Sequence, residues 1–255
     1  MALEDIFMRS SHLSFRSGNP TLSAKTFAGS YGNLDQVMTI QGTVNRTLIS
    51  LLILLTSAFL TYIFEWLIFA IVGGILGFIL VIATVFKPQW SPTTVPLYSL
   101  FQGAALGAIS YFFNAMYDGI VTQAIIITIG IFLTLLVIYR ARLINVTQNF
   151  KLGVAAATGG IMILYVVSFF MSMFGAGQMP IMDIGNSSWI SIGFSLFVIV
   201  IAALNLVLDF DFIEEAAEKG VPKYMEWRAA LGLMVTLVWL YLEILRLLAK
   251  LYSRR

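Results

Sequence analysis

Acidic side chains in a long apolar run are the first residues of this sequence that could do chemistry. Asp209 and Asp211 stand in the stretch LNLVLDFDF, and Asn205 lies four residues before Asp209, on the same face of a helix. Charged groups in membrane spans usually face a bundle interior or a wet cavity rather than lipid. We therefore predict that Asp209 lines an ion or proton path, with Asn205 and, more weakly, Asp211 in support. The alternative is an interfacial Asp209 that reaches headgroup water, since it stands about one turn from the expected end of its helix.

A second acidic residue lies deep in the last apolar run. Glu243 stands in LVWLYLEILRLL, with Arg246 three residues later and Thr236 seven residues earlier on nearly the same face. Two interpretations stay open: Glu243 and Arg246 neutralise each other and orient the helix, or Glu243 lines an ion or proton path. If Asp209 and Glu243 lie close together in a low dielectric, they cannot both ionise cheaply, so protonation would change the packing between their helices.

The oxygen-bearing side chains near these carboxylates argue against a tightly stored metal ion. Calcium prefers about six to eight oxygen ligands. The polar residues of the two helices supply too few for tight binding: Asp209, Asn205, Thr236 and Glu243. We expect a weak transit site for a cation and for protons, and no resident metal or other cofactor.

The composition makes lipid the solvent for most of the chain. Of 255 residues, 59% are hydrophobic and 11% are charged, against roughly 25% charged in a soluble domain. The net charge of +2 forms no basic patch on a soluble face, which argues against nucleic acid as a partner. With no cysteine and one histidine, His12, the chain lacks the ligands of a zinc hydrolase. Serines in the spans have no histidine to act as a base, so we do not expect an enzyme.

Seven apolar segments are long enough to span a membrane, at about 20 residues each. They predict an all-α membrane domain over residues 43–255, preceded by a polar cytosolic N-terminal arm over residues 1–42. Three prolines, Pro88, Pro92 and Pro96, are expected to form the turn before the third helix. The predicted spans are 43–64, 66–86, 95–116, 119–139, 153–174, 189–210 and 227–250.

The basic residues predict the orientation of these spans. With a cytoplasmic N-terminus, eleven of the fifteen lysines and arginines fall on the inner side, as the positive-inside rule requires. The other four belong to the last span and its tail, which seven spans would place outside, against the rule. These four are Arg246, Lys250, Arg254 and Arg255.

Two G-x-x-x-G motifs lie in the second and third predicted spans, at Gly73 and Gly77 and at Gly103 and Gly107. Small residues at this spacing let two helix backbones approach closely. We expect ordinary packing within the chain rather than a dimer interface, because the motif alone specifies no partner.

Three stretches of the sequence carry a family resemblance: NPTLSAKTF at 19–27, MTIQGTVNRT at 38–47, and LVLDFDFIEEAAEKGVPKYMEWRAALGLMVTLVWLYLEILRLLAKL at 206–251. They resemble the Bax inhibitor-1 family, also called the transmembrane Bax inhibitor motif family, in its bacterial branch with a polar N-terminal arm. The resemblance implies seven helices with the last one central, and a location in the bacterial cytoplasmic (inner) membrane. It also implies a pH-sensitive leak of calcium and, in eukaryotes, suppression of cell death.

The resemblance assigns roles to two positions and leaves a third open. The family's Tyr-Asp-x-Gln motif at the end of helix 6 matches this chain at Asp209, and the arginine of its last helix matches Arg246. The second aspartate of the family stands ten residues before that arginine, where this chain has Thr236. The aspartate pair is therefore not preserved, and the second predicted span, 66–86, lacks the arginine that the family carries there. Glu243 is our candidate for the missing carboxylate.

Together these observations predict a membrane protein of Bax inhibitor-1 type that acts as a calcium (cation) leak channel, gated by protonation of intramembrane carboxylates. The alternative is a membrane adaptor that transports nothing and regulates other membrane proteins in a stress response. Glycine-rich helix faces and a polar arm would both suit such protein partners.

Overall fold

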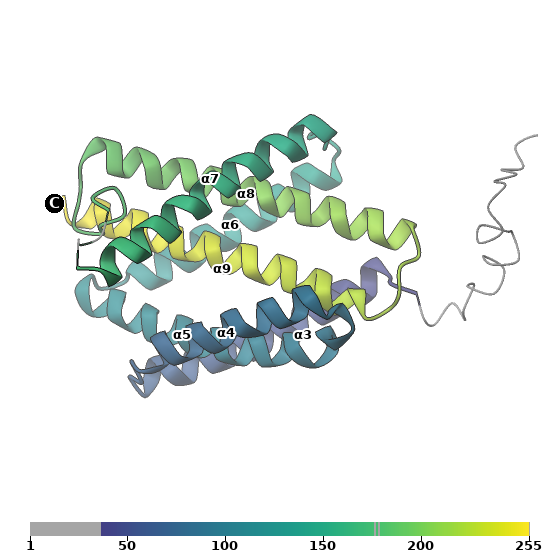
Figure 1. Ribbon diagram of the computed structural model, residues 1–255, viewed down its shortest axis with the longest axis horizontal. Coiled ribbons are helices and arrows are strands. Elements are labelled where there is room, and N and C mark those ends of the chain that lie inside the picture. Colours follow the sequence, from purple (N-terminus) through teal and green to yellow (C-terminus); the bar gives the residue numbers. More distant parts are fainter. Residues whose placement is uncertain (1–36, 176, 178, 255) are drawn as a thin grey trace, which may run out of the picture. The chain divides into compact units, whose positions relative to one another are not determined.

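The computed structural model describes residues 37–175, 177 and 179–254, in which helices dominate (Figure 1). The chain divides into two units, Met1–Val37 and Met38–Arg255, and all of the helices named below belong to the second. The predicted arm lies, up to residue 36, outside the described residues. The helices are α3 (Ile40–Ile63), α4 (Phe69–Phe86), η4 (Pro88–Trp90, a 3₁₀ turn), α5 (Ser91–Met116), α6 (Ile120–Arg140), α7 (Gln148–Met173), α8 (Trp189–Glu218) and α9 (Met225–Tyr252).

Six of the seven α-helices in this described part are long and apolar enough to cross a membrane, and α5 is the exception. The apolar side chains of these helices largely face outward. In α6, for example, only 11% of the most apolar stretch is buried within the protein, and Ile126, Ile129 and Leu133 are exposed. Surfaces of this kind are stable only against lipid. The chain is therefore an all-α integral membrane protein.

Several helix boundaries differ from the predicted ones, and polar residues at the ends explain the two described here. Helix α3 begins three residues early, at Ile40, because the Thr39 side chain accepts a hydrogen bond from Gly42 N at 2.9 Å and caps the helix. Helix α8 runs on past residue 210 to Glu218. Asp209 thus stands nine residues before the helix end, and the prediction of about one turn was wrong. Good helix formers and the i,i+4 pair of Glu215 with Lys219 extend the last turns.

The turn before α5 contains one of the three expected prolines rather than all three. Pro88 opens η4, whereas Pro92 lies in the first turn of α5 and Pro96 lies inside this helix. A proline in the first turn costs nothing there, since that N–H has no partner within the helix. Ser91 Oγ donates to the Tyr224 carbonyl at 2.8 Å, which fixes the start of α5 beside the start of α9.

Both glycine motifs are used inside the chain. A Cβ atom on Gly103 or Gly107 would overlap the backbone of α3, at Leu54 and Ala58 respectively, and one on Gly73 would overlap the Phe101 carbonyl of α5. Helices α3 and α4 thus pack on α5 backbone to backbone. The prediction of packing within the chain is confirmed, and these glycine faces are not free to bind a partner.

Helix α9 packs against α3, α5, α6 and α8. Figure 1 shows it running between the layer of α3, α4 and α5 and the layer of α6, α7 and α8. Half of its most apolar stretch is buried within the protein, the largest share of any of the six apolar helices. Helix α9 can therefore carry charged side chains that a lipid-facing helix could not.

The helix connections alternate between the two ends of the bundle (Figure 1). The start of α3 and the start of α9 share one end, where Met38 N donates to the Val221 carbonyl at 2.8 Å. The end of α9 lies at the opposite end, where its Tyr252 hydroxyl accepts from Gln123 Nε2 at 2.6 Å. These two ends are called the α3-start end and the α9-end below.

Candidate functional site

One face of α9 carries polar or small side chains along most of the helix. The residues recur every three or four positions, the spacing that keeps side chains on one face. This polar face of α9 consists of Gly232, Thr236, Trp239, Glu243, Arg246 and Lys250. Its partners come from α7, from α8 and from the segment that joins them.

Asp209 of α8 faces the polar face of α9 near its start. Its Oδ1 atom lies 3.4 Å from the position that a Cβ on Gly232 would take, and the Thr236 side chain interacts with the carboxylate. Asp209 Oδ2 is buried and has no hydrogen-bond partner. A buried carboxylate oxygen without a partner is unfavourable unless a proton, an ion or water satisfies it. Asp209 Oδ2 is therefore the buried oxygen of this carboxylate that a proton, an ion or water would satisfy.

Glu243 lies in the middle of the polar face and is 1% exposed. The Tyr165 hydroxyl of α7 donates to Glu243 Oε1, and Arg246 Nη1 pairs with the same oxygen. Arg246 Nη1 and Trp239 Nε1 each also donate to the Tyr165 hydroxyl at 3.4 Å. Glu243 Oε2, in contrast, is buried without a hydrogen-bond partner. The expected pairing of Glu243 with Arg246 is thus present, but it leaves half of the carboxylate unsatisfied.

The two carboxylates do not contact each other. Asp209 lies beside Thr236, and Glu243 stands seven residues further along α9, a rise of about 10 Å. The structure puts Thr236 opposite Asp209, where the resemblance would place a second aspartate. Glu243 instead forms a separate cluster with Tyr165 and Arg246.

Lys250 ends the polar face and is fully buried, with 0% exposure. Its Nζ atom donates to the Ile181 carbonyl at 2.8 Å, to the Ser191 carbonyl at 3.2 Å and to Ser195 Oγ at 2.9 Å. All three acceptors are neutral, and all three belong to the start of α8 or to the segment before it. A buried ammonium without a carboxylate partner is rare and expensive. These three hydrogen bonds hold that segment against the polar face at the α9-end.

Two of the predicted supporting residues serve other contacts. Asn205 Nδ2 donates to Thr158 Oγ1 of α7 at 2.8 Å and to the Ile201 carbonyl of its own helix, also at 2.8 Å. Asp211 forms an ion pair with Lys151 Nζ at 2.5 Å, toward the α3-start end. Both residues join α7 to α8, and neither hydrogen-bonds to Asp209.

Two residues of the candidate site were not predicted: Tyr165 and the buried Lys250. Lys250 follows Glu243 by seven residues, the same interval that separates Glu243 from Thr236, so its spacing was a usable signal. For Tyr165, an aromatic residue in an apolar span, the sequence offers no signal. Within the described residues, no group of three or more histidine, cysteine, aspartate or glutamate side chains could hold a metal ion.

Comparison with known families gives one match. The sequence profile of the family described as Bax inhibitor 1 like matches residues 19–253 of the chain. No curated protein and no solved structure matches the chain.

Proposed function

Because the chain belongs to the Bax inhibitor 1 like family, we propose that it forms a cation path through the membrane, with calcium as the first candidate ion and protonation of buried carboxylates as the gate. The path follows the polar face of α9 between α7 and α8. It passes Asp209 and Thr236 first, then Glu243 and Tyr165, and ends at Lys250.

One observation carries this proposal. Asp209 Oδ2 and Glu243 Oε2 are both buried and both lack a hydrogen-bond partner, and both stand where α8 or α7 meets the same face of α9. Protein interiors rarely leave such oxygens unsatisfied. A proton on each carboxyl, or a passing cation between the helices, would supply the missing partner at both positions.

Protonation of Asp209 can act as the gate, because this carboxyl lacks the charged partner that Glu243 has. Thr236 is the polar group that faces Asp209, and no charged residue of the described part pairs with this carboxyl. Glu243 faces Tyr165 from α7, Arg246 one turn on, and the charge of Lys250 further along α9. Loss of a proton from Asp209 would create an uncompensated charge in a low dielectric, so it would draw in a cation or push α8 away from α9.

Lys250 closes the path in this conformation. A buried positive charge at one end of a narrow path repels any cation that approaches it. For the path to conduct, Lys250 must release Ile181 and Ser191, and the segment before α8 must move. Lys250 is therefore the proposed outer barrier, and the carboxyls are the proposed sensors.

The proposal includes an arrangement in the membrane. All seven α-helices would cross it, with α5 shielded by its neighbours, and the α3-start end would face the cytoplasm of a bacterium. Lys87, Arg140 and Lys223 lie in or beside connections at this end, as the positive-inside rule requires. A reporter domain fused after Arg254 tests this placement: activity on the cytoplasmic side would contradict seven spans.

Calcium flux into liposomes between pH 6 and 8 is the direct test of function. The parent chain should leak calcium in a pH-dependent way, and Asp209→Asn or Glu243→Gln should flatten that dependence. Asp211→Asn is the matched control, because it removes one carboxylate from α8 outside the polar face. A parent chain no leakier than empty liposomes at every pH would contradict a calcium path and favour the adaptor role.

A further inference from the structure

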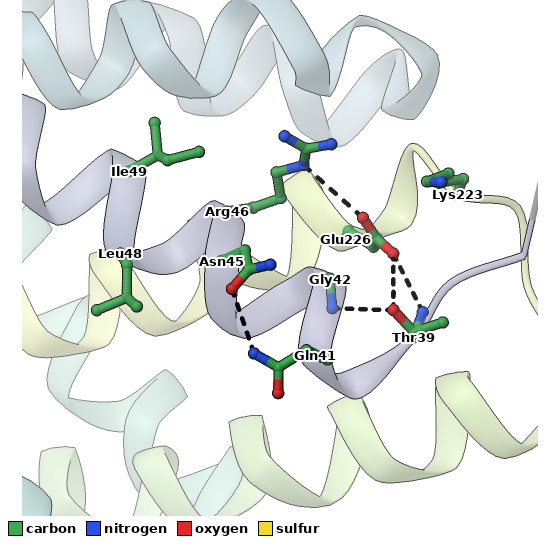
Figure 2. Close-up of a pocket in the computed structure, with 9 residues that line it drawn as sticks. All are labelled: Thr39, Gln41, Gly42, Asn45, Arg46, Leu48, Ile49, Lys223 and Glu226. Atoms are coloured by element: carbon green, nitrogen blue, oxygen red, sulfur yellow. Dashed lines mark hydrogen bonds and ion pairs between the residues drawn. The ribbon is translucent and has the colours of Figure 1, made fainter. Parts of the chain in front are cut away.

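A second charged cluster lies at the α3-start end, in a pocket that the ion path does not use. The pocket has a volume of about 640 Å³ and lies between the first three turns of α3 and the start of α9 (Figure 2). Its walls include Gln41, Asn45 and Arg46 on the polar side and Leu48 and Ile49 on the apolar side.

Arg46 is the functional group of this pocket. Its guanidinium carbon lies 5.0 Å from the centre of the Trp227 ring, which holds the side chain by a cation–π contact. Its Nε atom is buried, lacks a hydrogen-bond partner, and stands 3.7 Å from Glu226 Oε2. Figure 2 shows both Nη atoms turned away from Glu226. The fork of donors that suits a phosphate is therefore still available.

Glu226 does not cancel the attraction of the pocket for an anion, because its oxygens are engaged. It is 1% exposed, and its Oε1 accepts from both Thr39 N and Thr39 Oγ at 3.2 Å. It occupies the space above Gly42, where any Cβ would overlap it. Glu226 thus lies beneath Arg46 and orients it, while Arg46 and Lys223 present positive charge at the pocket.

The pocket changes from polar to apolar along little more than two turns of α3. Gln41, Asn45 and Arg46 come first, and the exposed Leu48 and Ile49 follow. The next exposed residue on this helix, Leu52, is 65% exposed and belongs to the lipid-facing surface. A ligand that fits needs an anionic, hydrogen-bonding head continuous with a hydrocarbon chain.

We propose that this pocket binds the phosphodiester headgroup of an anionic phospholipid. Arg46 donates to the phosphate oxygens, Asn45 and Gln41 contact the polar remainder of the headgroup, and an acyl chain lies along Leu48, Ile49 and Leu52. Free phosphate would use the arginine but leave the apolar wall uncovered. The bound lipid would bridge α3 and α9, since Arg46 comes from α3 and its supports Glu226 and Trp227 come from α9.

Lipid retention measured by native mass spectrometry tests the proposal. The full chain is purified from a mixture of equal parts phosphatidylglycerol and phosphatidylcholine, and the ratio of the two retained lipids is compared between variants. Arg46→Gln should lower the phosphatidylglycerol preference about tenfold, the equivalent of one lost charge-assisted bidentate contact. Lys87→Gln is the matched control, because Lys87 also stacks on a tryptophan, Trp90, at this end but lies outside the pocket.

Two further variants keep the test decisive if Arg46→Gln alone folds poorly. Arg46→Gln with Glu226→Gln removes the cation and its partner together and should show the same loss of preference, whereas Glu226→Gln alone should retain it. Equal preference in the parent and the double variant would overturn the proposal. So would displacement of the lipid by millimolar inorganic phosphate, which would assign the site to the free ion.

Discussion

Helix α9 buries two glutamates, Glu226 near its start and Glu243 near its middle, and each is 1% exposed and paired with an arginine. They differ in how their oxygens are used. Glu226 divides its two oxygens between Thr39 and an arginine. Glu243 concentrates its partners on Oε1 and leaves Oε2 without any.

This difference separates a structural carboxylate from one available for chemistry. A buried carboxylate whose two oxygens both have partners holds two helices together, and its loss leaves the remaining groups unsatisfied. A carboxylate with one free buried oxygen gains less from its partners and responds more to a proton or a cation. Burial and pairing with arginine alone would not have distinguished the two residues.

The largest loss of stability is expected from a substitution at Gly42, which would disrupt the contacts of Glu226. A Cβ at this position would overlap the Glu226 carboxylate, so Gly42→Ala should displace Glu226 from Thr39 and Arg46. We expect a loss of about 3 kcal/mol in stability, as for other disrupted buried ion pairs. Thermal unfolding in detergent measures it. Gly74→Ala is the control, because nothing lies within 4 Å of its added Cβ, and equal destabilisation in both variants would contradict a cause in the contact with Glu226.

Glutamine substitutions test the two glutamates separately, because they remove the charge of the side chain but keep its shape. Glu226→Gln should lose about 2 kcal/mol, since a charged acceptor is replaced by a neutral one between helices. Glu243→Gln should lose less than half of that stability, because the partners of Glu243 compensate its charge only in part. In liposomes the order reverses: Glu243→Gln alters the pH dependence of calcium flux, and Glu226→Gln leaves it at the parent profile. If both variants alter flux equally, the two glutamates do not have separate roles.

Removing Lys250 tests whether the path that contains Glu243 is closed at its end. Lys250→Met abolishes three hydrogen bonds to the start of α8 and the segment before it, together with the buried positive charge. Calcium flux should rise about tenfold, which corresponds to a barrier lower by ~1.4 kcal/mol. Lys219→Met, which removes a surface lysine that pairs with Glu215, should not change flux. Unchanged flux in Lys250→Met would remove the barrier from the proposal.

The smallest loss of stability is expected for the partly exposed ion pair of Asp211 with Lys151, at the surface of the bundle. Both side chains are partly exposed, at 23% and 32%, so water replaces the lost partner. Asp211→Asn should cost less than about 1 kcal/mol by thermal unfolding, and the cost should shrink in 1 M salt. A larger loss that salt does not change would indicate a structural role for this pair comparable to that of Glu226.

Most of the helices could be predicted from the sequence, because a hydrophobic run of membrane length is rarely anything but a helix in lipid. The pairing of Glu243 with Arg246 followed from their spacing, and the glycine motifs predicted close packing. The extension of α8 was missed because its last turns are polar and hydropathy does not mark them. Their helix formers and the i,i+4 pair of Glu215 with Lys219 were readable in the sequence, whereas the ion pair of Lys151 with Asp211 joins two helices and was not. A membrane boundary is visible in hydropathy, but a helix can continue beyond it.

The candidate site was predictable in its carboxylates and in two of their partners, Thr236 and Arg246. Asp209 and Glu243 stand out because charge in an apolar run is costly. Their separation along α9 was not predictable, because it depends on which turn of α8 meets which turn of α9. The importance of Glu226 was also missed: it looks like a solvated charge at a helix start, and its burial arises from Thr39, which is 187 residues away in the sequence.

The close packing of α5 also has a consequence for how the chain is made. Helix α5 is less apolar than the six other helices, and it packs against α3 through Gly103 and Gly107 and against α4 through Gly73 and Gly77. A segment of this kind gains too little from lipid alone to leave the translocation channel by itself. Its partition into the bilayer must follow that of α3 and α4, whose backbones give it a surface to pack on. The first three helices are therefore expected to insert as one cooperative unit during synthesis, before α9 exists to be enclosed.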